Sequence, residues 1–187
     1  LFTATISNRG GGTINKLILQ EKNSSGYKYF GTYLEDTEYY PDELVELAPI
    51  TNNSCTPCLA DFNTENQEYF YFNQPFYLKT SLASDVVLSG NQSKTLTFRY
   101  DDPKGFSIEK SVTFYGNTYQ TDHDYIIINK EKFYPENLEL IWSGGLRPTE
   151  IYEMDDVTYA SAIAGQAGEI EDINQTNKDD NIKRVVF

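Results

Sequence analysis

Two strands and the turn between them can be read in TLTFRYDDPKGFSIEKSVTF, residues 95–114. Side chains alternate between the two faces of a strand, so the apolar residues within 96–100 share one face. Residues 101–105 carry turn chemistry, because proline fixes φ and glycine permits positive φ. Apolar residues alternate again over 106–114, and the whole stretch therefore predicts an antiparallel hairpin with one buried face.

Short alternating or aromatic stretches continue on both sides of this hairpin. Residues 2–6 and 14–19, separated by a flexible glycine-rich turn, predict a second hairpin. Further strands are expected at 27–34, 69–72, 76–79, 119–129 and 138–142. A meander is the simplest topology, and the sequence predicts an all-β fold, a large antiparallel β-sandwich.

Only two stretches favour a helix, residues 41–47 and 149–154, and each begins at or just after a proline. Residues 165–183 are rich in Gln, Asn, Asp and Glu, so we expect a mobile loop there. Large sandwiches often form one unit of this length, and residues 1–187 are expected to be a single domain.

The balance of acidic and basic residues limits the classes of partner that this chain can bind. The 187 residues include 15 basic and 28 acidic side chains, which give a formal charge of −13. Such a surface repels phosphate backbones, so we expect no nucleic-acid partner. No apolar run approaches the ~20 residues that cross a bilayer. Any membrane contact is therefore expected through flanking transmembrane segments outside residues 1–187.

The only histidine, His123, has Asp122 and Asp124 as neighbours. Such a cluster suggests a metal ligand or a general base. In a strand, however, consecutive side chains point to opposite faces, so both aspartates would lie away from the imidazole. We therefore expect a partly buried structural histidine.

Cys55-Thr56-Pro57-Cys58 has the two-residue spacing of redox motifs, whose first cysteine is activated at a helix N-terminus. A polar loop precedes this pair, and no strong helix follows it. There is also no second pair to complete a four-thiolate zinc site. The sequence leaves open a local disulfide or two thiols, and it favours a structural role over redox chemistry.

Other candidates for chemistry have simpler interpretations. Glu150 and the adjacent Asp155 and Asp156 could form a carboxylate pair for glycoside hydrolysis, but adjacent acids in a loop are usually solvated. The glycine-rich turn joins two strands and lacks the helix N-terminus that would hold an anion. We expect no enzymatic activity and no metal or other cofactor.

Two motifs carry a resemblance to a known protein family. The first is TISNRGG at residues 5–11, followed by Ile14, and the second is LIWSGGLRPTE at residues 140–150. Their distinguishing residues are Asn8, Arg9, Gly10, Gly11, Trp142, Gly144, Gly145, Leu146, Thr149 and Glu150. Both motifs resemble segments of the large periplasmic domain of the YidC family of membrane protein insertases, in a form similar to Bacteroidetes-type members. The hairpin at residues 95–114 lies where that family places its central strands.

The glycines of the second motif would let the backbone turn sharply after the Trp142 strand. Thr149 and Glu150 would then open a short helix or loop. These are structural roles.

The resemblance implies a β-supersandwich, similar to galactose mutarotase-like folds, on the periplasmic side of a bacterial inner membrane. It implies a monomeric accessory domain that helps to insert and fold inner-membrane proteins, through Sec translocon components or nascent membrane proteins. Mutarotase chemistry uses paired histidines and a glutamate, and only His123 is present. The alternatives are a carbohydrate-binding or carbohydrate-active sandwich that stacks sugars on tyrosines, and a spacer without a partner.

Overall fold

The computed structural model describes residues 1–34, 38–48, 55–82, 85–143, 146–152, 161–166 and 168–174. These residues form strands that pair antiparallel throughout, together with one 3-10 turn, η1 (Lys130–Lys132). The strands are β1 (Phe2–Ser7), β2 (Thr13–Leu19), β3 (Lys22–Asn23), β4 (Gly26–Tyr27), β5 (Phe30–Tyr33), β6 (Tyr39–Leu44), β7 (Cys58–Asn63), β8 (Glu68–Tyr71), β9 (Tyr77–Leu78), β10 (Ser93–Asp101), β11 (Ser107–Tyr115), β12 (Thr121–Ile128), β13 (Leu138–Ile141), β14 (Ser161–Gln166) and β15 (Glu169–Asn174).

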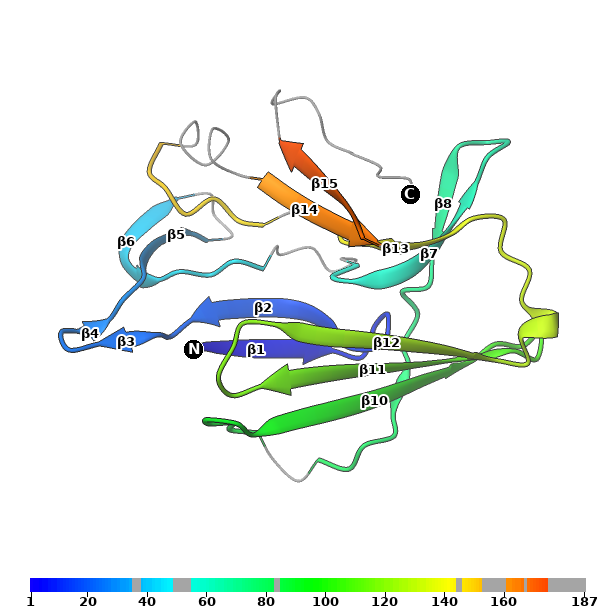
Figure 1. The fold of residues 1–187 in the computed structure, drawn as a ribbon, viewed down its shortest axis with the longest axis horizontal. Helices are drawn as coiled ribbons and strands as arrows, with labels where there is room; N and C mark the ends of the chain where they lie inside the picture. Colours follow the sequence, from blue (N-terminus) through cyan, green and yellow to red (C-terminus); the bar gives the residue numbers. More distant parts are fainter. Residues whose placement is uncertain are drawn as a thin grey trace.

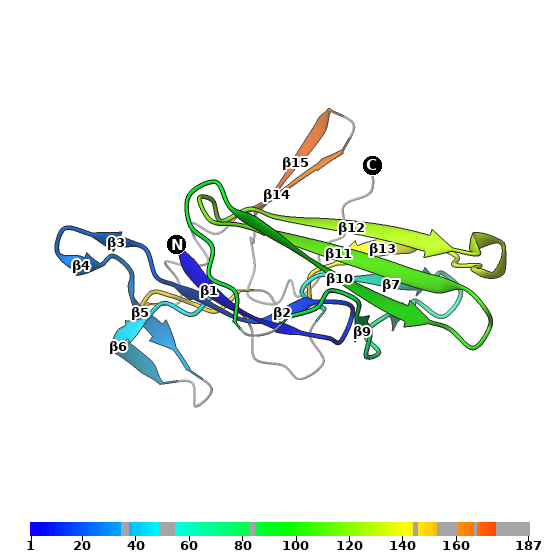
Figure 2. The same cartoon turned by 90° about the horizontal axis from the view of Figure 1, so that it is seen from below.

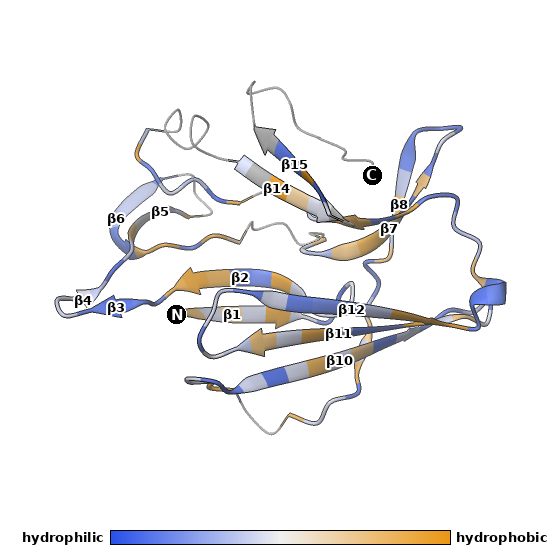
Figure 3. Cartoon of the chain, viewed as in Figure 1, coloured by the Kyte–Doolittle hydropathy of each residue, from blue (hydrophilic) through white to orange (hydrophobic). Residues whose placement is uncertain are grey.

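The largest sheet has the strand order β12-β11-β10-β9 and contains the hairpin read first in the sequence. Leu96 pairs with Val112, and Phe98 pairs with Lys110, in a register without shifts. Figure 3 shows hydrophilic and hydrophobic residues alternating along β10 and β11. The hairpin and the meander through β12 are confirmed.

Two smaller sheets lie across the core from this one, with the orders β1-β2 and β13-β7-β8, and the β5-β6 hairpin contributes no residue to this core. Figures 1 and 2 show β10, β11 and β12 side by side along one side of the molecule, near β1–β2 and β7. The buried cluster between them contains Leu59, Phe72, Phe76, Leu96, Phe98, Phe106 and Ile108. The all-β, sandwich-like arrangement is therefore the one that the alternation predicts.

Both helix predictions fail where the structure describes the residues. Residues 41–44 belong to β6, which pairs with β5 through Thr32↔Tyr40 and Tyr33↔Tyr39. The rings of Tyr33 and Tyr39 lie 5.3 Å apart, so cross-strand packing overrides the local helix signal. Residues 149–152 form no helix, and residues 153 and 154 lie outside the described part of the chain.

The predicted loop at 165–183 is wrong for its first part. Gly165 and Gln166 end β14, and residues 169–174 form β15, with Gly168 at φ 93° in the turn between them. Figure 1 shows this hairpin projecting from the rest of the fold. Residues 175–183 lie outside the described residues. Among the helices that the structure describes, none is long and apolar enough to cross a membrane.

Candidate functional site

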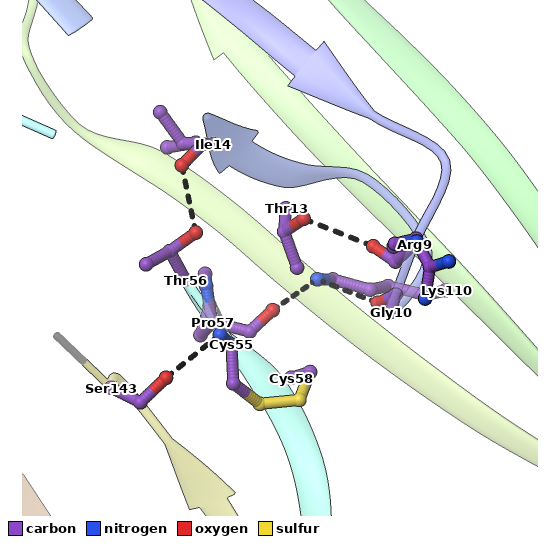
Figure 4. The surroundings of a disulfide bond; sticks show 10 residues. All are labelled: Arg9, Gly10, Thr13, Ile14, Cys55, Thr56, Pro57, Cys58, Lys110 and Ser143. Atoms are coloured by element: carbon purple, nitrogen blue, oxygen red, sulfur yellow. Dashed lines mark hydrogen bonds between the residues drawn. A yellow bond between two sulfur atoms is a disulfide. The ribbon is translucent and has the colours of Figure 1, made fainter. Parts of the chain in front are cut away.

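Lys110, in β11, is the most deeply buried charged side chain among the described residues, at 0% exposed. Its Nζ donates hydrogen bonds to the carbonyl oxygens of Pro57, at 2.6 Å, and Gly10, at 3.3 Å (Figure 4). The same Nζ lies 5.3 Å from the centre of the Tyr125 ring on β12. One amine therefore joins three segments that are distant in sequence, and we call Gly10, Pro57, Lys110 and Tyr125 the Lys110 node.

The charge of Lys110 has no carboxylate partner among the residues described. Burial lowers the pKa of Lys110 to about 7, because desolvation disfavours the ammonium form. Burial also raises the pKa of Tyr125, so its ring stays neutral beside the amine. Two carbonyl dipoles and a ring face stabilise the ammonium when it forms. The amine changes charge near neutral pH, but its burial keeps solvent-borne substrates away from it.

Cys55 and Cys58 form a disulfide, which settles the alternatives that the sequence left open. Cys58 begins strand β7 and Cys55 lies just before the turn that leads into it, so the helix that activates a redox cysteine is absent from this described segment. Both side chains are buried, at 1% and 0% exposed. The backbone N–H of Cys55 donates to Ser143 Oγ at 2.8 Å, and that of Ser143 donates to the Cys55 carbonyl at 2.8 Å. The disulfide loop is thus joined to the strand that carries the second motif.

The loop between the cysteines also pairs with β2. Thr56 Oγ1 donates to the carbonyl of Ile14 at 2.7 Å, and the N–H of Ile14 donates to the carbonyl of Thr56 at 2.9 Å. The Thr56–Pro57 peptide is cis. Together with the Lys110 bond to Pro57, these contacts hold the loop between the two layers.

The first motif forms a packed turn instead of the flexible one that its glycines predict. Gly11 has φ 71°, and a Cβ there would lie 2.9 Å from Phe76 and 3.1 Å from Lys110. The Asn8 carbonyl accepts hydrogen bonds from the N–H groups of Gly11 and Phe76. Arg9 forms an isolated bridge with the chain at Pro75. Glycine is required at position 11 by both conformation and space.

The structure describes the second motif at residues 140–143 and 146–150. Trp142 is 43% exposed and Leu146 is 61% exposed, while Gly144 and Gly145 lie outside the described residues. Thr149 and Glu150 follow in irregular chain, so of the short helix or loop that they were expected to open, residues 149–152 form a loop.

Arg147 anchors this motif to β5 and the segment after β6. Its Nη1 donates to the Tyr33 carbonyl at 3.0 Å, and its Nε donates to the Ala48 carbonyl at 2.9 Å. Its Nη2 lies 3.5 Å from the buried carboxylate of Glu46, and its backbone N–H donates to the carbonyl of Leu47. The planar guanidinium thus satisfies two backbone carbonyls at once and faces a buried carboxylate.

His123 lies as the strand pattern predicts. Its Nε2 is 3.0 Å from Thr121 Oγ1, and its residue pairs with the buried Val112, whereas Asp122 accepts from Tyr115 Oη on the other face. Burial, reinforced by the charge of Lys110, lowers the pKa of His123 to about 4. The His123 imidazole is therefore neutral at pH values well above 4 and is only weakly basic. The described residues contain no group of three or more His, Cys, Asp or Glu side chains suited to a metal. Asp155 and Asp156 lie outside them.

Sequence reasoning missed two residues that join distant segments of the chain, Lys110 and Arg147. Lys110 was detectable, because alternation places it on the apolar face between Ile108 and Val112. Arg147 gave no comparable signal, since its carbonyl partners belong to segments about a hundred residues earlier.

Comparison with known proteins finds no match among protein-family models, curated proteins or solved structures.

Proposed function

We propose that this chain is a non-catalytic, periplasm-facing domain of a membrane protein insertase, which assists the insertion and folding of inner-membrane proteins. The pair of motifs at residues 5–11 and 140–150 carries the proposal, because both resemble the large periplasmic domain of that family. The sandwich-like, all-β arrangement agrees with the fold that the resemblance implies.

The contacts of the motif residues support a structural use of both motifs. Gly10 accepts from Lys110, Ser143 pairs with Cys55, and Arg147 holds backbone carbonyls. These groups connect the layers of the fold and are directed at the chain itself. The domain would therefore act through its surfaces, toward Sec translocon components or nascent membrane proteins, as a monomer without a cofactor.

The carbohydrate-binding alternative rests on exposed aromatic rings. Tyr134 is 84% exposed and Tyr152 is 71% exposed, and such rings can stack on sugars. Calorimetric titration of residues 1–187 with a panel of oligosaccharides separates the two proposals. We expect no saturable heat, and specific binding of one sugar would favour the alternative.

The insertase proposal is tested by isolating the complete gene product after mild crosslinking of the cells that produce it. Sec translocon subunits and inner-membrane proteins under synthesis are expected in the isolate. The matched control is the same gene product lacking residues 1–187, which should recover fewer of them. Equal recovery from both forms would overturn the interaction role.

A further inference from the structure

One edge of the largest sheet is long and regular. β12 has eight residues and pairs with β11 alone, in a register without shifts. No backbone hydrogen bond joins its other side to any residue described. Figure 2 shows the outer side of β12 at the margin of the sheet. A row of backbone donors and acceptors is therefore available there for another strand.

The other edges that the structure describes are shorter or interrupted. β9 has two residues, and β8 and β13 have four each. β1 shifts register between Thr5 and Ile6, and β6 contains Pro41 and pairs through a shifted register. Short length, proline, bulges and charged side chains all protect sheet edges from added strands. Of these features β12 has only charged side chains, Asp122 and Asp124, and like charges along an edge leave it open to a strand of opposite charge.

The charged side chains on β12 and its neighbours indicate what kind of partner strand could pair with this edge. Asp122, Asp124 and Ile126 share the outer face of β12, and Ile126 is 60% exposed. Basic side chains on this face are already paired: Arg99 contacts Asp101 and Glu109, and Lys79 contacts Glu109.

The two aspartates differ in their contacts. Asp122 accepts hydrogen bonds from Tyr115 and Gln120, and the Tyr115 bond lowers the pKa of Asp122. Asp124 has no hydrogen bond or ion pair with a described residue. Both carboxylates therefore lack a cationic partner within the described chain, and the formal charge of −13 adds a field that attracts cations.

We propose that the free edge of β12 binds an extended basic segment of a partner protein by β-strand addition. In the antiparallel arrangement of this fold, the partner would read, from its N-terminus, apolar-x-basic-x-basic. The apolar residue lies beside Ile126, and the basic residues lie beside Asp124 and Asp122. A second copy of β12 fits poorly, because its aspartates would meet these aspartates. This inference adds a surface to the proposed interaction domain, but it is tested on the chain alone.

The probe is an eight-residue peptide with valine, lysine and lysine at its third, fifth and seventh positions and threonine elsewhere. Binding to residues 1–187 is followed by NMR, through amide shifts and hydrogen-exchange protection in β12. We expect saturable shifts confined to β12 and its neighbours. A peptide with glutamate in place of both lysines should bind at least tenfold more weakly. A peptide N-methylated at alternate residues keeps the charge but loses one row of donors, and it should not bind.

Two variants test the named contact. Asp124→Asn should lower the affinity for the lysine peptide by roughly two- to fivefold, as expected for the loss of one exposed ion pair. Glu65→Gln removes an exposed charge from the turn between β7 and β8 and should leave binding unchanged. Equal binding of the N-methylated peptide, or equal loss in both variants, would show nonspecific charge attraction and overturn the proposal. Absence of binding by every peptide would also overturn it, while leaving the insertase proposal to its own test.

Discussion

Replacing Lys110 by methionine keeps an unbranched side chain, one atom shorter, and removes its charge and its hydrogen bonds. The pKa of Lys110 falls from its ordinary 10.5 to about 7 in the folded protein. Each tenfold change in proton affinity corresponds to about 1.4 kcal/mol, so protonating this buried amine costs about 5 kcal/mol relative to the unfolded chain. Against this, the variant leaves the carbonyls of Gly10 and Pro57 without the amine, at roughly 1–3 kcal/mol each.

These opposing costs make the pH dependence the decisive quantity. Between pH 7 and 10.5 the unfolded chain binds a proton at Lys110 that the folded chain has released, so stability rises with pH. From pH 7 to pH 9 this lysine should add about 2 kcal/mol to the free energy of unfolding. The methionine variant lacks this contribution. Between pH 7 and pH 9 the free energy of unfolding of the wild type should therefore rise by about 2 kcal/mol more than that of the variant.

Urea unfolding at pH 7, 8 and 9, followed by circular dichroism without reductant, measures the difference. Lys104→Met, in the exposed turn after β10, is the matched control and should follow the wild type at every pH. A constant difference between Lys110→Met and the wild type across this range would refute the account of the Lys110 node.

Three further outcomes follow from the packing. Gly11→Ala should destabilise the fold by about 2–4 kcal/mol in urea unfolding, because positive φ and overpacking add. A Cβ at Gly168 would meet no atom within 4 Å, so Gly168→Ala should cost only about 1–2 kcal/mol. Equal costs for the two substitutions would contradict the overpacking expected at Gly11. Arg147→Met should cost about 2–6 kcal/mol, since it leaves the carbonyls of Tyr33 and Ala48 without their guanidinium donor at roughly 1–3 kcal/mol each, whereas Glu46 keeps its ion pair with Lys16. A cost below ~1 kcal/mol would show that the anchor is dispensable. Finally, the His123 ring should stay neutral at pH 5.5 in an NMR titration. Because its pKa is lowered on folding, His123 should reduce stability as pH falls from about 6.5 toward 4, and a titration midpoint near 6.5 would contradict its burial.

The alternation of residues 95–114 was enough to predict the central hairpin, because period-two patterning specifies both strand and face. The same rule placed His123 and Asp122 on opposite faces, which the contacts confirm. The rule also singles out Lys110, because it places this lysine on the otherwise apolar face of its strand. Patterns within a single strand are therefore read well from this sequence.

Features that depend on distant segments were not predictable in the same way. Residues 41–44 carry a proline and acids that favour a helix start, yet pairing with β5 makes them a strand. The polar composition of 165–174 suggested a loop, whereas Gly168 permits a hairpin turn. The glycines of the first motif looked flexible because no sequence rule reports that Phe76 and Lys110 pack against Gly11. Tertiary contact decided each of these cases.

The most direct test of the proposed interaction role is site-specific photo-crosslinking from the surface of this domain in the complete gene product in living cells. A photoreactive residue is placed in turn at the exposed positions of Val87, Ile126, Tyr134 and Ile163. We predict that at least one position yields adducts with Sec translocon subunits or with inner-membrane proteins under synthesis. Absence of such adducts from every position, with membrane insertion unchanged after deletion of residues 1–187, would contradict it.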